Sequence, residues 1–152
     1  MKKDDTCTNS DSPRPISNRT NIRPAISSDV PIIKTLIAAY PEQLVQDYLP
    51  DAEDFFVAVM TDPSTGPGQV IGCCALQIYS QRLAEIRSLA VAKEHQGKGV
   101  GTALIEQCLG KARARNVHEV LSITSALPLF EKQGFSTFKN EKYALIKVID
   151  SQ

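Results

Sequence analysis

The sequence predicts an α+β domain around a mixed, mostly antiparallel central sheet, and three observations support this fold class. Three β-rich runs follow one another without an intervening helix, at residues 55–60, 70–79 and 82–91. A Gly-rich segment then opens an amphipathic helix at residues 100–115, and another β-rich run follows at residues 117–123. Strands joined by short turns pair antiparallel, whereas a helix between two strands is typical of a parallel pair.

The first part of the domain is predicted to be a strand followed by helices. Residues 22–25 form a short strand, and Pro24 places it at a sheet edge or a strand end. A helix then runs to about Tyr40, because four apolar residues recur at helical spacing, namely Ile32, Ile33, Leu36 and Ile37. Residues 42–48 are predicted to form a second short helix, which Pro50 closes.

The later elements follow from alternation and end signals. In the strand at 82–91 we expect Ala84, Ile86, Ser88 and Ala90 on one face, and Glu85, Arg87, Leu89 and Val91 on the other. Residues 125–133 are predicted to form a short helix, with Gly134 just beyond its end. Residues 135–138 and 143–149 are predicted to be two final strands.

Length and composition indicate one globular domain preceded by a tail. The chain has 152 residues, 42% of them hydrophobic, and its 17 basic and 17 acidic residues cancel. A chain of this size can bury a core of its own, and a neutral chain offers no bulk attraction for nucleic acid or an anionic membrane. Residues 1–20 are polar, so we predict a flexible tail followed by a single domain at residues 21–152.

The cysteine pattern favours a reducing, cytoplasmic location and no metal site. The four cysteines form no C-x-x-C pair, and two histidines accompany them. A structural zinc site needs about four closely spaced ligands. The N-terminus lacks the apolar stretch of a secretory signal, and no apolar run is long enough to span a bilayer.

The segment most indicative of chemistry joins the strand at 82–91 to the helix at 100–115. Gly97, Gly99 and Gly101 alternate there, so backbone N–H groups can turn toward a ligand without a Cβ clash. These groups stand at a helix N-terminus, which suits an anion such as a pyrophosphate. The sequence has no G-x-x-x-x-G-K-[ST] string of a P-loop, and a Gly loop after antiparallel strands does not fit a Rossmann site.

Two segments resemble a known family. Residues 96–101 read QGKGVG and match the Q/R-x-x-G-x-G/A signature of the GNAT superfamily of acyl-CoA-dependent N-acyltransferases. Residues 129–135 read LFEKQGF and look like the FYEKxGF segment of that family. The resemblance covers about residues 22–149, and it implies helices on both faces of the sheet. It also implies that the strands on either side of the helix at 100–115 splay apart to form an acyl-CoA cleft.

The resemblance further implies acetyl-CoA as co-substrate. The pantetheine arm would pair with the backbone of Leu89, Ala90 and Val91, and Phe130 would form part of the wall. The pyrophosphate would be held by the loop amides of Gln96, Gly97, Lys98, Gly99, Val100, Gly101 and Thr102. The reaction would be direct attack of a substrate amine on the acetyl thioester.

Three residues are implied around the reacting atoms. The N–H of Val91 would meet the oxyanion. Glu85 would act as a base toward the amine, or would instead pair with the substrate ammonium or with Arg87. Arg87 would bind a substrate carboxylate, the alternative being an ordinary ion pair with Glu85.

The general acid is the point at which this sequence departs from the family. The tyrosine of the FYEKxGF segment is replaced by Phe130, which has no proton to give. Thr124, a water molecule, or another tyrosine such as Tyr79 or Tyr143 would then protonate the thiolate. Because a thiol has a pKa of about 8.5, its thiolate is a fair leaving group even without a strong acid.

Three functions are compatible with these residues. The sequence is similar to the short amino-acid N-acetyltransferases, including N-acetylglutamate synthase-like proteins, which implies a small, amino-acid-like amine as acceptor. The alternatives are a protein N-acetyltransferase and a non-catalytic acyl-CoA-binding sensor, which Phe130 keeps open. No nucleic acid or membrane partner is expected. A homodimer is compatible with the resemblance, because dimers are frequent in the family.

Overall fold

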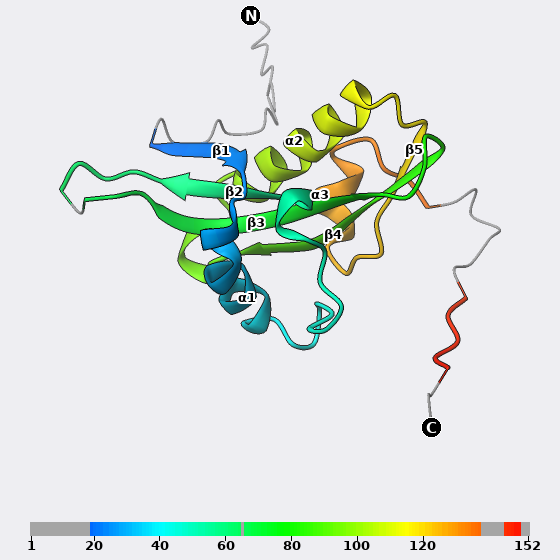
Figure 1. The fold of residues 1–152 in the computed structure, drawn as a ribbon, viewed down its shortest axis with the longest axis horizontal. Helices are drawn as coiled ribbons and strands as arrows, with labels where there is room; N and C mark the ends of the chain where they lie inside the picture. Colours follow the sequence, from blue (N-terminus) through cyan, green and yellow to red (C-terminus); the bar gives the residue numbers. More distant parts are fainter. Residues whose placement is uncertain (1–18, 65, 138–144, 150–152) are drawn as a thin grey trace, which may run out of the picture.

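The computed structural model describes residues 19–64, 66–137 and 145–149, and these contain one five-stranded sheet (Figure 1). Its strands lie in the order of the chain: β1 (Thr20–Pro24), β2 (Phe55–Met60), β3 (Gln69–Ile78), β4 (Leu83–Val91) and β5 (Glu119–Leu121). The pairs from β1 to β4 are antiparallel, and β4 pairs with β5 in parallel. The mixed, mostly antiparallel sheet is therefore confirmed.

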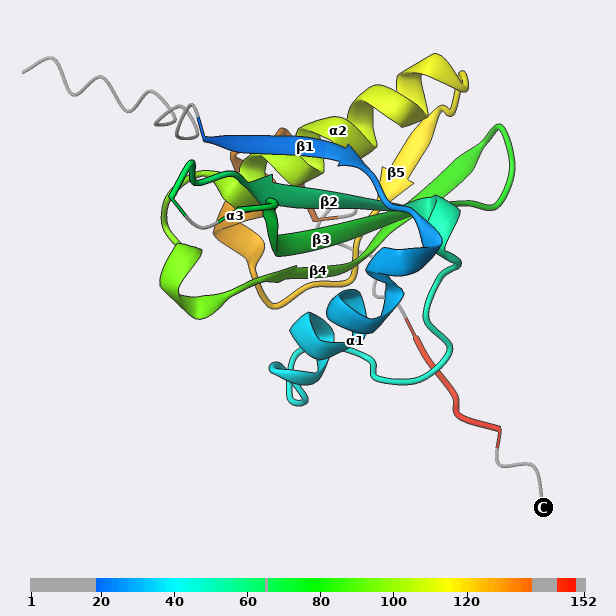
Figure 2. The ribbon, with the colours of Figure 1, turned by 60° about the vertical axis from the view of Figure 1, so that its left-hand side comes forward.

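Helices cover both faces of this sheet, as Figure 2 shows for α1 (Val30–Ala38) and α2 (Val100–Ala114). A third helix, α3 (Leu127–Glu131), follows β5, and 3-10 turns occupy Ser27–Asp29, Ala52–Asp54 and Lys93–His95. Apolar side chains of α1 pack with Val57, Cys73 and Ala75, whereas those of α2 pack with Ala58, Cys74 and Leu76. Neighbouring residues of β2 and β3 are thus buried on opposite faces, which explains their continuous apolar runs.

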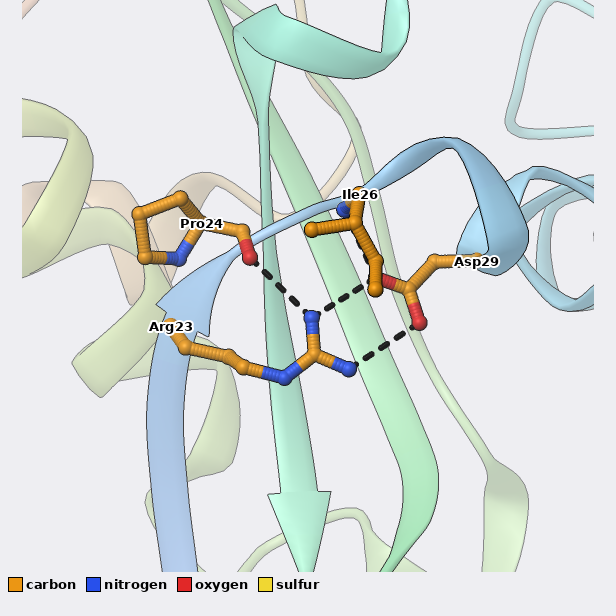
Figure 3. A network of polar contacts seen from close by, with 4 residues as sticks. All are labelled: Arg23, Pro24, Ile26 and Asp29. Atoms are coloured by element: carbon orange, nitrogen blue, oxygen red, sulfur yellow. Dashed lines mark hydrogen bonds and ion pairs between the residues drawn. The ribbon is translucent and has the colours of Figure 1, made fainter.

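The start of α1 is tied to the end of β1 by an ion pair (Figure 3). Arg23 donates from Nη1 to Oδ2 of Asp29 at 2.7 Å and from Nη2 to Oδ1 at 3.0 Å. Asp29 also accepts the N–H of Ile26 at 2.8 Å. The hydrogen bond from Arg23 is the main cause that holds the pKa of Asp29 below its ordinary value, against the opposing effect of burial. This carboxylate therefore joins β1, the turn and α1.

A bulge in β4 changes which residues share a face, and the expected alternation is wrong beyond Arg87. The register with β3 shifts so that Arg87 lies opposite Ala75 but Ala90 lies opposite Cys73, and Ser88 has a positive φ of 55°. One extra residue reverses the alternation. Leu89 and Val91 therefore join Ile86 on the α2 side, and Ala90 packs on the α1 side, rather than following the predicted faces.

The segment after α1 is not the predicted helix at 42–48. The N–H groups of Gln43 and Leu44 bond to the carbonyl of Tyr40, but the helix does not continue. Gln46 Nε2 donates hydrogen bonds to the carbonyls of Ile37 and Leu44 instead, and Tyr48 has a positive φ of 52°. These side-chain bonds satisfy groups that a helix would have used.

Several boundaries also differ from the sequence prediction. Thr20 pairs with Met60 and so belongs to β1 and not to the tail, of which residues 1–18 lie outside the described residues. The predicted strand at 117–123 and helix at 125–133 shorten to β5 and α3. Residues 135–137 and 145–149 are not strands in the described part of the chain, because no described strand pairs with them, and residues 138–144 lie outside it.

Candidate active site

A cleft of about 940 Å³ opens beside β4, where β4 and β5 part. The two strands pair only from Leu83 to Glu85 on β4, opposite β5. Beyond that point Ser122 Oγ donates to the carbonyl of Ile86 at 3.1 Å, and the chain then leaves the sheet toward α3. Residues 86–91 of β4 therefore form one wall, and residues 122–126 and α3 form another. The splayed pair that the resemblance implied is present in the structure.

One end of the cleft is closed by the loop that starts α2. Gly97 and Gly99 have φ values of 71° and 85°, which glycine adopts without strain, and Gly99 is the N-cap of α2. No side chain among the described residues caps this helix. The first amides of α2 are therefore left for another acceptor, since Ala103 is the first residue whose N–H bonds back, to the carbonyl of Gly99. This donor set fits the pyrophosphate of acetyl-CoA.

Most residues predicted to hold the cofactor line this one cleft. They are Leu89, Ala90, Val91, Gln96, Gly97, Gly99, Val100, Gly101, Thr102 and Phe130. Lys98 is exposed and does not line it. An added Cβ on Gly101 would lie 3.2 Å from Leu129 Cδ2, so this glycine allows α3 to pack close to the loop. The structure thus assembles residues that are about 40 positions apart in sequence into one wall.

Val91 directs its backbone polar groups into the cleft. Ala92 donates its N–H to the carbonyl of Ile71 at 2.9 Å and so faces β3. Successive residues of a strand direct these groups to opposite sides, so the N–H and C=O of Val91 face away from β3. Its carbonyl accepts hydrogen bonds from the hydroxyl of Tyr40 and from Gln96 Nε2, the latter at 3.3 Å. The predicted oxyanion donor is therefore oriented toward the cleft.

Tyr40 lines the cleft. From the sequence we expect residues 40–51 to contribute to the acceptor groove, but nothing in the sequence assigns Tyr40 a role in the chemistry. Its hydroxyl also accepts a hydrogen bond from Gln96 Nε2 at 2.7 Å. Tyr40 lies 51 residues before Val91, and no local pattern connects the two. Only the position of α1 across the sheet brings them together.

Arg87 and Glu85 occupy different positions relative to the cleft. Arg87 lines it, and its Nη1 donates to Gln77 Oε1 at 2.8 Å. Glu85 does not line it, and its carboxylate accepts the hydroxyl of Tyr79. The two residues lie two positions apart and both come before the bulge. Their side chains therefore share one face of β4, the face toward α1. The cationic side chain of Arg87 therefore lines the cleft, whereas the anionic side chain of Glu85 lies outside its lining.

The candidates for the general acid are placed very differently. Phe130 is 3% exposed and packs edge-on against Phe135, with ring centroids 5.2 Å apart. Thr124 lines the cleft, and its Oγ1 accepts the N–H of Ala126 at 2.9 Å. Tyr79 does not line the cleft, and burial followed by its bond to Glu85 raises its pKa. Tyr143 lies outside the described residues.

The described cysteines offer no nucleophile to the cleft. Cys73, Cys74 and Cys108 are buried, and none lines it. Burial raises the pKa of Cys73 to about 12, so its thiol stays protonated at neutral pH. The described part of the chain also has no group of three or more candidate metal ligands. Among the described helices, none is both long and apolar enough to cross a membrane.

Known proteins are similar to this chain in sequence and in fold. Residues 28–135 match the Acetyltransferase (GNAT) family. An uncharacterized N-acetyltransferase of Chlorobaculum tepidum is 33% identical over 130 residues, covering 82% of this chain and 80% of that protein. An amino-acid acetyltransferase of Mycobacterium tuberculosis is 32% identical over 128 residues, covering 81% of this chain and 72% of that protein. The crystal structure of Rv2747 from Mycobacterium tuberculosis, in complex with CoA and NLQ, is 32% identical with a TM-score of 0.68, over 76% of this chain and 71% of that one.

Proposed function

Since this chain belongs to the GNAT acetyltransferase family, we propose that it acetylates the primary amine of a small, amino-acid-like molecule. The chain is an N-acetyltransferase that uses acetyl-CoA, and the acceptor is the part that we infer. The amino-acid acetyltransferase that is 32% identical supports this acceptor class. The observation that carries the proposal is the guanidinium of Arg87 in the cleft, beside the open edge of β4.

Arg87 suits the carboxylate of an amino acid. Its bonds to Gln77 Oε1 at 2.8 Å and to the carbonyl of Tyr48 at 3.5 Å hold the side chain and use two of the five N–H donors of a guanidinium. A carboxylate that accepts the other donors gains charge-assisted hydrogen bonds, which are stronger than neutral ones. Glu85 lies on the same face of β4 and adds a negative charge for the ammonium of the acceptor. Because Glu85 is outside the cleft lining, we infer that it receives through water the proton that the ammonium of the acceptor loses before the attack.

The reaction then follows from the cleft geometry. The loop amides from Gln96 to Thr102 hold the pyrophosphate, and the open edge of β4 pairs with the pantetheine arm. The acetyl carbonyl accepts the N–H of Val91, where negative charge develops as the amine attacks. Direct attack is supported by the absence of a cysteine among the described residues that line the cleft.

The test is the release of free thiol from acetyl-CoA with a panel of amino acids, matched amines without a carboxylate, and peptides. We expect Arg87→Gln to raise KM about 10- to 100-fold for an amino acid, the cost of one lost charge-assisted hydrogen bond, and to leave KM for the matched amine within about twofold. Arg113→Gln, at the far end of α2, is the control and should change neither value.

Two outcomes would contradict the amino-acid acceptor. One is an equal rise of both KM values in Arg87→Gln. The other is thiol release with peptides but with no amino acid, which would favour a protein acceptor instead.

A further inference from the structure

The hydroxyl of Tyr40 lies at the backbone of Val91, where we have placed the reacting thioester. Tyr40 follows α1, lines the cleft, and donates its hydroxyl proton to the Val91 carbonyl. The N–H of Val91 faces the same side as this carbonyl, and we have proposed it as the donor to the acetyl oxygen. Tyr40 therefore carries an acidic proton next to the position of the thioester.

We propose that Tyr40 is the proton donor to the departing CoA thiolate, a role that rests on acetyl transfer in this cleft. Phe130 stands where the resembling family has a tyrosine, and it is buried in the core. Tyr79 is bound to Glu85 outside the cleft. Thr124 lines the cleft, but an aliphatic hydroxyl is a far weaker acid than a phenol. Tyr40 thus combines the required acidity with the required place.

Gln96 supports this role from the phosphate loop. Its Nε2 donates to the Tyr40 oxygen at 2.7 Å and to the Val91 carbonyl at 3.3 Å. An N–H donor at the phenol oxygen stabilises the negative charge that the oxygen carries after it gives up its proton. A pantetheine amide that pairs with the Val91 carbonyl would take the place of the hydroxyl there. The Tyr40 proton would then be free to turn to the sulfur.

The proposed step balances without another reagent. The amine nitrogen bonds to the carbonyl carbon, and the C–S bond breaks with its electron pair on sulfur. The hydroxyl proton of Tyr40 passes to that sulfur and forms the CoA thiol. The nitrogen of the new amide loses one proton, which returns through water to the Tyr40 oxygen. The products are the acetylated amine and CoA, and Tyr40 is restored.

The experiment compares Tyr40→Phe with Tyr48→Phe, which removes an exposed hydroxyl from the loop after α1. We expect Tyr40→Phe to lower kcat about 10- to 100-fold, at or below the low end of what a positioned acid contributes, because a thiolate leaves readily. We also expect the wild-type rate to fall at alkaline pH and the rate of Tyr40→Phe not to fall there. The Kd for acetyl-CoA should change less than about threefold, and Tyr48→Phe should match the wild type. An unchanged kcat and pH profile in Tyr40→Phe would overturn the proposal.

A second variant keeps the test valid if Tyr40→Phe does not fold. Incorporation of 3,5-difluorotyrosine at position 40 retains the ring and the hydroxyl but makes the phenol more acidic. The alkaline fall of the rate should move to lower pH, and an unmoved profile would overturn the role. Acceptor-free hydrolysis of acetyl-CoA is measured in parallel, because the same thiolate leaves. Hydrolysis without transfer to amino acids would contradict the proposed acceptor class. Equal hydrolysis in the wild type, in Tyr40→Phe and in the difluorotyrosine variant would contradict the role of Tyr40 as proton donor.

Discussion

The two halves of β4 have different neighbours, although they belong to one continuous strand. From Leu83 to Glu85 the strand is closed by β5 on one side and β3 on the other. From Ile86 to Val91 it keeps β3 but loses β5, and the cleft takes its place. The closed half needs only regular pairing. The open half depends on a bulge, on a glycine loop and on the end of α1.

This comparison shows how a sheet edge is kept available for a ligand. β5 has three residues, after which Thr124 Oγ1 accepts the N–H of Ala126 and turns the chain into α3. Pro128 lies in the first turn of α3 and has no N–H to offer to a strand. The edge of residues 86–91 is therefore open because its neighbour turns away early. Substitutions in the open half should change acetyl-CoA affinity, and those in the closed half should leave that affinity unchanged.

The largest expected effect is that of Gly99→Val on cofactor binding. Gly99 has a φ of 85°, and a β-branched residue in that conformation costs about 1–3 kcal/mol. The branched side chain would also stand where the phosphates approach, so we expect acetyl-CoA affinity to fall about 10- to 100-fold, or about 1.4–2.7 kcal/mol by calorimetry. Gly66→Val is the control, because Gly66 has a similar φ of 87° in the β2–β3 turn. It should lose stability but retain affinity; a normal Kd in Gly99→Val would separate the loop from the pyrophosphate.

A smaller effect, on the free energy of unfolding, is expected at the ion pair that fixes the start of α1. Asp29→Asn removes a carboxylate that binds Arg23 and the N–H of Ile26, and should lower the free energy of unfolding by about 1–3 kcal/mol at pH 7. The lower part of this range is expected, since the Arg23 side chain is 35% exposed.

The pH dependence of this effect has a definite sign. The folded-state pKa of Asp29 is lowered, so its stabilisation is complete above the unfolded value of about 3.9 and is lost as pH falls through the folded value. The stability difference between wild type and Asp29→Asn, measured by denaturant unfolding, should be constant above about pH 5 and shrink below about pH 4. Asp47→Asn, which removes an exposed carboxylate, is the control for the loss of one negative charge. A difference that grows in acid would contradict this assignment.

The smallest effect is expected in the closed half. Arg82 Nη2 lies 3.6 Å from Glu119 Oε2 across the β4–β5 pair, with the two side chains 79% and 54% exposed. Exposed pairs of this kind contribute little, so Arg82→Gln should change the free energy of unfolding by less than about 0.5 kcal/mol. Acetyl-CoA affinity should also stay unchanged. A loss of affinity would show that the closed half does contribute to the cleft, and would weaken the comparison.

The order of the elements up to α3 could be predicted from the sequence, because each depends on local periodicity. The apolar runs of β2 and β3, the stripe of α2 and the alternating glycines from Gly97 to Gly101 are all local signals. The same glycines predict a phosphate site, since the free N–H groups of a helix N-terminus after such a loop suit an anion. The predicted helix at 42–48 was wrong: Gln46 Nε2 donates to the carbonyls of Ile37 and Leu44 there, and these contacts are not visible in a periodic pattern.

What the sequence by itself determined is the fold class, the family and the glycine loop that we propose to hold the phosphates. The tertiary structure alone decided which side chains meet in the cleft. The bulge at Ser88 moved Leu89 and Val91 to the face opposite Arg87, because one extra residue reverses an alternation of period two. The packing of α1 on the sheet brought Tyr40 to Val91, across 51 residues of sequence. Contacts of this kind depend on long-range packing, and no local pattern of residues predicts them.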